Sequence, residues 1–109
     1  MAHSVERVAV IGLGLIGSSI ARAVKERLPQ VVVTGHDASE AVRDTARALG
    51  LCDHLPGDPA AAVENADIVI LAVPVGGKAD AAGAIAPGLA PHAIISDVAV
   101  ISDGRVRLR

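Results

Sequence analysis

Residues 8–17 read VAVIGLGLIG, a short apolar run followed at once by glycines at positions 12, 14 and 17. An uninterrupted apolar run is typical of a strand buried on both faces, as in parallel sheets. Apolar side chains then recur at every fourth position from Ile16 to Leu28, which predicts an amphipathic helix that ends before Pro29. The stretch therefore predicts a strand, a glycine-rich turn and a helix in immediate succession.

The same alternation continues along the chain. Further strands are expected at 31–34, 51–55, 68–73 and 93–96, and further helices near 42–49, 58–63 and 78–89. Strands that alternate with helices over short connections build a parallel sheet covered on both faces. We therefore expect an α/β fold, a Rossmann-type doubly wound parallel sheet, as a single domain over residues 1–98.

Residues 99–109 depart from this alternation and form a divergent basic tail. Ser102-Asp103-Gly104 is a turn signal, and the arginines at 105, 107 and 109 alternate with Val106 and Leu108. Alternation with period two is typical of a half-exposed strand. A hairpin or edge strand and a frayed basic terminus are both compatible with this tail.

The composition excludes several classes of protein. Hydrophobic residues make up 51% of the 109 residues and charged residues 20%, which is enough apolar material for one folded core. The chain has no Phe, Trp or Tyr and a net charge of -2. It therefore lacks both the stacking side chains and the excess of cations that nucleic-acid binding requires.

Cysteine and histidine give no sign of a metal site. Cys52 is the single cysteine, so no disulfide can form within the chain, and the four histidines do not have metal-ligand spacing with it. The longest apolar run, 68–75, is too short to cross a bilayer, and residues 1–6 do not resemble a secretory signal. We expect a cytoplasmic protein without membrane contact, and we assign no catalytic residue.

The glycine motif carries the clearest functional prediction. Directly after a strand and at the start of a helix, Gly12 permits the tight turn, Gly14 lets a pyrophosphate approach the backbone, and Gly17 lets helix and strand pack closely. Leu15 and Ile16 contribute backbone amides at the positive end of the helix. An ordinary glycine-rich turn is the alternative, and the strand-turn-helix context favours nucleotide binding.

Asp37 supplies a second signal, at the end of the second strand and 20 residues after Gly17. A carboxylate there accepts hydrogen bonds from the adenosine ribose hydroxyls. It also repels a 2′-phosphate, and Ala38 and Ser39 offer no guanidinium in its place, so NAD is expected rather than NADP. The alternative is that Asp37 caps the following helix in a capping box with Glu40.

Other polar and apolar residues fall near the same expected crevice. Val73 and Pro74, which end the 68–73 strand, are expected to line the nicotinamide side, and His36 to touch the adenosine. The role of Asp97 stays open between crevice and turn. Lys78 is expected to be solvated, as are three histidines: His3, His54 and His92.

Four segments in this order resemble the NAD-binding domain of prephenate and arogenate dehydrogenases: VAVIGLGLIGSS at 8–19, GHD at 35–37, ADIVILAVPV at 66–75 and IISDV at 94–98. The resemblance covers roughly residues 5–98. It implies an oxidoreductase of tyrosine biosynthesis, an aromatic amino acid pathway, that oxidatively decarboxylates prephenate or arogenate with NAD or NADP.

The resemblance also has departures. Family members continue Asp-Val-Gly-Ser-Val-Lys after the fifth strand, whereas Val100 stands here in place of the serine near substrate and nicotinamide. The family's catalytic histidine and dimer-forming helices come from later segments. We expect a cofactor-binding domain that does not catalyse alone and that self-associates through an uncovered apolar face. The alternative is a stand-alone module that senses NAD or docks on another protein.

Overall fold

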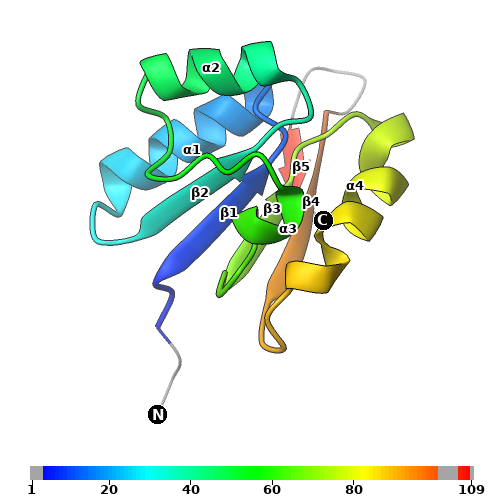
Figure 1. Ribbon diagram of the computed structural model, residues 1–109. Helices are drawn as coiled ribbons and strands as arrows, with labels where there is room; N and C mark the ends of the chain where they lie inside the picture. Colours follow the sequence, from blue (N-terminus) through cyan, green and yellow to red (C-terminus); the bar gives the residue numbers. More distant parts are fainter. Residues whose placement is uncertain (1–3, 101–105, 109) are drawn as a thin grey trace.

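A computed structural model describes residues 4–100 and 106–108 of the chain. Five strands form one sheet in the order β2-β1-β3-β4-β5 (Figure 1). The four strands β1 (Arg7–Ile11), β2 (Val32–His36), β3 (Ile68–Leu71) and β4 (Ile94–Val100) run parallel, and β5 (Val106–Leu108) is antiparallel to β4. From β1 the chain adds β2 on one side and then β3 and β4 on the other side. At such a change of strand order a crevice is expected at the carboxyl ends of the two strands concerned, here β1 and β3.

Helices cover both faces of this sheet (Figure 1). On one face, α1 (Leu15–Arg27) and α2 (Glu40–Ala48) pack through Ala21 and Ala46 against Val8, Val10 and Val33. On the other face, the short α3 (Pro59–Ala62) and α4 (Lys78–Ile85) close a second cluster around Ala9, Ile11, Val69 and Leu71. Single-turn 3-10 helices, η1 (Val75–Gly77) and η2 (Ala86–Gly88), flank α4. The expected doubly wound α/β fold is confirmed.

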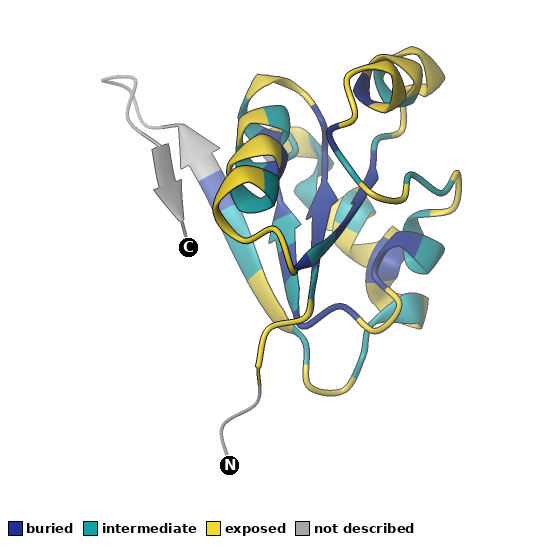
Figure 2. Cartoon of the chain, turned by 90° about the vertical axis from the view of Figure 1, so that its left-hand side faces the viewer, coloured by how far each residue is buried: buried dark blue, intermediate teal, exposed yellow. Residues whose placement is uncertain are grey.

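Successive residues of β1 belong alternately to the two hydrophobic clusters, because neighbouring side chains of a strand point to opposite faces of the sheet. Val8 and Val10 belong to the first cluster, whereas Ala9 and Ile11 belong to the second. The central strands are buried, and the outer surfaces of the helices are exposed (Figure 2). A strand buried on both faces has to be apolar throughout, which is why the pattern at 8–11 is continuous.

The expected strand at 51–55 is reduced to one bridge, between Thr34 and His54. The segment does run beside β2, where the Asp53 and His54 N–H groups donate to the Val33 carbonyl. The Val33 N–H, however, donates to the Asp53 carboxylate at 2.8 Å and not to a main-chain carbonyl. A side chain therefore occupies one position of the ladder, and Pro56, which has no N–H, follows two residues after the bridge.

The carboxyl-terminal strand also differs from the sequence expectation. β4 continues four residues beyond Ser96, and its last three residues, Val98–Val100, pair with β5. Of the two interpretations of the tail, the pairing favours the hairpin or edge strand. The expected turn at 102–104 lies outside the described residues. Among the described helices, none is long and apolar enough to cross a membrane.

Candidate nucleotide-binding groove

The glycine loop after β1 has little room for side chains at its first position. Gly12 has φ +98°, a conformation that L side chains rarely adopt, and a Cβ there would lie 2.6 Å from the Ala72 carbonyl oxygen. The Gly12 N–H donates to the His36 carbonyl at 2.8 Å. The loop is therefore fastened between the ends of β2 and β3, and only glycine fits the turn.

Gly17 and Gly14 differ in what surrounds them. Gly17 is buried in α1, and a Cβ there would overlap the Gly12 carbonyl oxygen, so the helix packs directly on the loop. Gly14 is the N-cap residue of α1, and a Cβ there would meet nothing within 4 Å. The first turn of α1 has no side-chain cap and no acidic residue. Its N–H groups and positive dipole end therefore suit an anion.

Asp37 connects this loop to the segment after β2. One carboxylate oxygen accepts the Leu13 N–H at 2.8 Å, and the other accepts the Ser39 N–H at 2.9 Å. The cap of α2 is Ser39, whose hydroxyl accepts the Val42 N–H at 3.3 Å. The capping-box alternative for Asp37 and Glu40 is therefore wrong, since another residue performs that role.

These elements surround a cavity of about 930 Å³ at the carboxyl ends of the strands. Most of the residues expected to bind the nucleotide line it: Gly12, Gly14, Leu15, Ile16, His36, Asp37, Val73 and Pro74. Gly17 does not line the cavity, because it lies beneath the loop. His36 is buried, and its Nδ1 lies 3.2 Å from the Pro56 carbonyl. One groove thus brings together the glycine loop, the end of β2 and the residues that follow β3.

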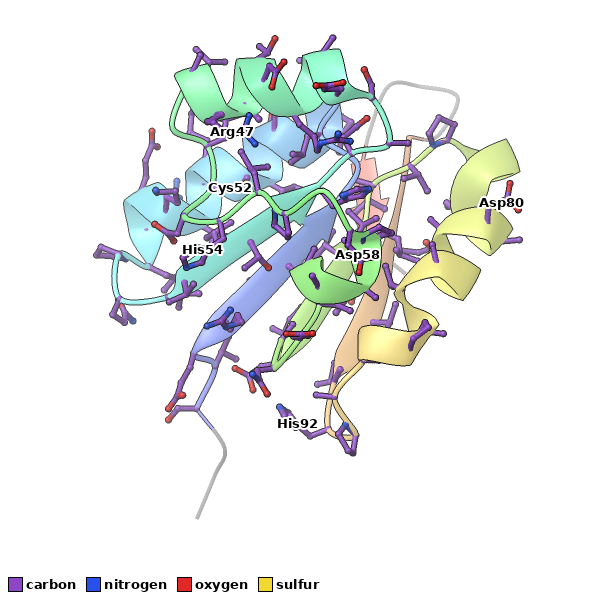
Figure 3. The ribbon with its side chains drawn as sticks, viewed as in Figure 1. Arg47, Cys52, His54, Asp58, Asp80 and His92 are labelled. Carbon is purple, nitrogen blue, oxygen red and sulfur yellow. The ribbon has the colours of Figure 1, made fainter. Side chains whose placement is uncertain are left out.

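The opposite wall was not expected from the sequence. Pro59 of α3 and four residues of α4, Lys78, Asp80, Ala81 and Ala84, also line the cavity. Figure 3 shows Asp80 on α4 and Asp58 at the start of α3. The sequence did indicate both helices, but a long-range packing arrangement decides which of their faces meets the groove.

Lys78 and Asp97 form an ion pair at one end of this wall, with Nζ 3.4 Å from a carboxylate oxygen. The expectation that Lys78 is simply solvated is wrong: its side chain retains 18% exposure. The other Asp97 oxygen is buried and has no hydrogen-bond partner among the described residues. Asp97, whose role the sequence did not decide, therefore holds the Lys78 ammonium at the edge of the groove.

Arg43 is a second polar residue that the sequence reasoning missed. From α2, its Nη1 donates to the Asp37 carbonyl at 2.7 Å and to the Ala38 carbonyl at 3.4 Å. The spacing could have indicated it, because Arg43 lies six positions after Asp37, in the first turns of the helix that follows the strand. A guanidinium thus lies beside the loop where none was expected.

The remaining titratable groups near β2 lie behind the groove. Burial raises the pKa of the Cys52 thiol to about 11, and the charge of Lys25 only partly opposes this. The Val33 N–H lowers the pKa of Asp53, helped by Lys25 at 3.1 Å. His54 and His92 also lie away from the groove (Figure 3). Among the described residues, no group of His, Cys, Asp and Glu could hold a metal ion.

A doubly wound sheet, a glycine loop on a helix N-terminus and a carboxylate at the end of the second strand together define a dinucleotide-binding domain. Comparison with known proteins narrows this class. The chain matches the family described as prephenate dehydrogenase, nucleotide-binding domain, over residues 20–106, and it belongs to that family. Membership confirms the NAD-binding domain expected from the sequence. The match begins within α1, so the assignment of the glycine loop is supported by its sequence pattern and its geometry and not by the family match.

Individual relatives agree with the family. The chain is 51% identical over 92 residues to the cyclohexadienyl dehydrogenase of Zymomonas mobilis, which covers 84% of this chain and 31% of that enzyme. It is 40% identical over 70 residues to the prephenate dehydrogenase of Lactococcus lactis, covering 64% of this chain and 19% of that enzyme. The chain thus spans a third or less of the length of these relatives.

Solved structures show the same fold. Arogenate dehydrogenase of Synechocystis superposes with a TM-score of 0.78 at 28% identity, covering 87% of this chain and 33% of that one. Prephenate dehydrogenase of A. aeolicus, in complex with hydroxyphenyl propionate and NAD+, gives 0.77 at 22% identity, covering 89% of this chain and 34% of that one. The second likeness concerns the fold alone.

Proposed function

We propose that the groove holds NAD in one orientation, with the pyrophosphate on the first turn of α1 and the adenosine ribose on Asp37. The observation that carries this proposal is the open space at Gly14, the N-cap residue of a helix whose first turn has no side-chain cap. An anion placed there meets backbone N–H groups and the positive end of the helix dipole. The binding residues are Gly12, Gly14, Leu15, Ile16, Gly17, His36, Asp37, Val73 and Pro74.

The preference for NAD over NADP depends on Asp37. Its two oxygens already accept the Leu13 and Ser39 N–H groups, which holds the carboxylate in place at the end of β2. Each oxygen keeps a further lone pair for a ribose hydroxyl. The 2′-phosphate of NADP at the same position would be repelled by the Asp37 carboxylate, whereas the uncharged 2′-hydroxyl of NAD would not.

A complete enzyme that contains this domain would oxidatively decarboxylate prephenate or arogenate. This reaction would belong to tyrosine biosynthesis in the cytoplasm. NAD accepts the hydride in such a reaction. The described residues contribute one wall of the reaction site, through Val73, Pro74 and the paired Lys78. Substrate recognition would come from the remainder of the protein, since hydride transfer needs the substrate held close to the nicotinamide.

Self-association would involve the amino end of β4. Ile94 and Ile95 are 64% and 47% exposed, in the part of β4 that pairs with β3 but not with β5. As neighbours in a strand they point to opposite faces of the sheet, so a partner would have to contact this edge of the sheet from both sides, as a further domain or a second copy could. Sedimentation at several concentrations tests for the second copy, and I94K/I95K should reduce any association observed.

Calorimetric titration of NAD tests the binding proposal. Gly14→Val should abolish NAD binding and leave the fold intact, because its side chain enters the groove and no protein atom lies nearby. Gly57→Val is the matched control, since a Cβ at Gly57 also meets nothing within 4 Å and Gly57 does not line the groove. Unchanged NAD affinity in Gly14→Val would refute the pyrophosphate placement.

A further inference from the structure

Arg43 bonds to the main-chain carbonyl of Asp37, the residue whose carboxylate is proposed to bind the ribose. Arg43 is half-buried as a residue, and its Nη1 donates to the Asp37 and Ala38 carbonyls at 2.7 and 3.4 Å. Both carbonyls belong to residues that line the groove. The cation is therefore fixed next to the loop on which an adenosine ribose would rest.

The other charges near this loop decide what Arg43 could bind. Asp37 lies in the groove, and Glu40 is exposed in the first turn of α2. Arg47, one turn after Arg43, pairs with Asp44 at 2.9 Å and lies farther along the helix. Of these two arginines of α2, Arg43 is therefore the one that bonds to the loop carrying Asp37.

A guanidinium has five N–H donors in a planar fork, of which the two carbonyls engage only the Nη1 group. Arginine binds phosphate through two parallel hydrogen bonds, and an arginine near the end of the second strand is how dinucleotide folds accommodate a 2′-phosphate. The chain thus carries both a carboxylate that rejects this phosphate and a cation suited to it.

We propose that Arg43 is a latent ligand for the 2′-phosphate of NADP, and that the Asp37 carboxylate alone prevents its use. This inference rests on the proposed placement of the ribose at Asp37. Selectivity would then depend on two side chains with opposite effects on a 2′-phosphate, Asp37 at the end of β2 and Arg43 in α2. Neutralising Asp37 should then produce gain of NADP binding and not merely loss of NAD binding.

Adenosine 2′,5′-bisphosphate and AMP are suitable probes, because they differ only in the 2′-phosphate. Calorimetry on Asp37→Asn should give affinity for the bisphosphate at least roughly tenfold above that of the unmodified chain, the scale of one charge-assisted hydrogen bond. In Asp37→Asn/Arg43→Met this gain should disappear, while AMP binding stays within about twofold of the Asp37→Asn variant. Arg43→Lys in the same background should keep part of the gain, since the charge remains.

A gain that survives Arg43→Met would overturn the inference and leave simple relief of repulsion as the cause. Thermal unfolding of each variant identifies any loss of fold, and Arg43→Gln, which keeps a donor for the Asp37 carbonyl, replaces Arg43→Met if that variant is unfolded. Failure of the proposed function has a different result. In that case the unmodified chain binds neither AMP nor NAD.

Discussion

The Asp37 carboxylate accepts the backbone N–H of Leu13 at 2.8 Å, across 24 positions of sequence. Through this bond the end of β2 holds the glycine loop that follows β1. The second oxygen holds the Ser39 N–H, just before α2 begins. A residue expected to contact ligand therefore also fixes the shape of the loop that receives the pyrophosphate.

Asp37→Ala should consequently weaken both stability and NAD binding. Two backbone N–H groups lose their acceptor, which costs about 1 to 3 kcal/mol in the free energy of unfolding, and the ribose loses charge-assisted hydrogen bonds of similar size. Denaturant unfolding and calorimetry measure the two effects. Glu40→Ala, which removes an exposed carboxylate three residues later, is the control. NAD affinity as high in Asp37→Ala as in the control would remove Asp37 from the binding site.

Two helical glycines give a second test. Gly17→Ala should lower the free energy of unfolding by about 3 kcal/mol or more, because its methyl group overlaps the Gly12 carbonyl and backbone has to move. Gly83→Ala in α4 should raise it by about 0.5 to 1 kcal/mol, because the site is open and alanine favours helix. Equal melting temperatures for the two variants would show that α1 does not pack on the loop as described.

Periodicity predicted the elements that bury apolar faces, such as β1 and α1, because burial and local pattern coincide there. It failed at 51–55, where an apolar start suggested a strand and the Asp53 side chain takes over a ladder position. Local pattern does not tell whether a side chain or a carbonyl will accept a neighbouring N–H.

The groove was predicted on one side only. Its glycine loop and Asp37 are recognisable because motif and spacing lie close together in sequence. Lys78 and Asp97 meet because β4 lies next to β3 and α4 covers them, a relationship across 19 positions that no short motif contains. Arg43 could not be recognised from the two residues after Asp37, because it reaches the Asp37 carbonyl from α2, six positions further along the chain.

Asp53 should give the domain part of its sensitivity to acid. The pKa of its carboxyl is lowered, first by the Val33 N–H and then by Lys25, from an ordinary value of 3.8. A lowered folded pKa contributes stability above the ordinary value and loses it as pH falls through the folded pKa. Asp53→Asn should therefore reduce the free energy of unfolding at pH 6, with the difference from the unmodified chain shrinking below about pH 4.

Urea unfolding between pH 2 and 7 checks this dependence. Asp44→Asn is the control, because Asp44 pairs with Arg47 on the exposed surface of α2 and accepts no backbone N–H from the residues that the structure describes. Exposed ion pairs contribute little to stability, so that variant should follow the unmodified chain. A constant difference between Asp53→Asn and the unmodified chain across the whole range would mean that Asp53 titrates alike in the folded and unfolded states.

The last prediction concerns the opposite edge of the sheet, where Asp67 is buried with only 6% of its surface exposed. One of its oxygens accepts the Glu6 and Arg7 N–H groups at 2.8 and 3.0 Å, and the other lies 2.9 Å from His92 Nε2. Its own backbone N–H donates to the Arg7 carbonyl, and its carbonyl accepts the Ile94 N–H. Asp67 thus ties together the starts of β1, β3 and β4.

Asp67→Ala should lower the free energy of unfolding by about 2 to 4 kcal/mol, because the part-buried Glu6 and Arg7 N–H groups lose their acceptor and the contact to His92 is lost as well. The free energy of unfolding of Asp67→Asn, which keeps one acceptor oxygen, should lie between those of Asp67→Ala and the unmodified chain. His92→Ala should cost less than Asp67→Ala, since the His92 side chain is about half exposed. Denaturant unfolding ranks these variants, and calorimetry on the folded fraction should give NAD affinity within about twofold of the unmodified chain, because the groove lies at the other ends of the strands. A well-folded Asp67→Ala that had lost NAD binding would show instead that the two edges of the sheet are energetically coupled.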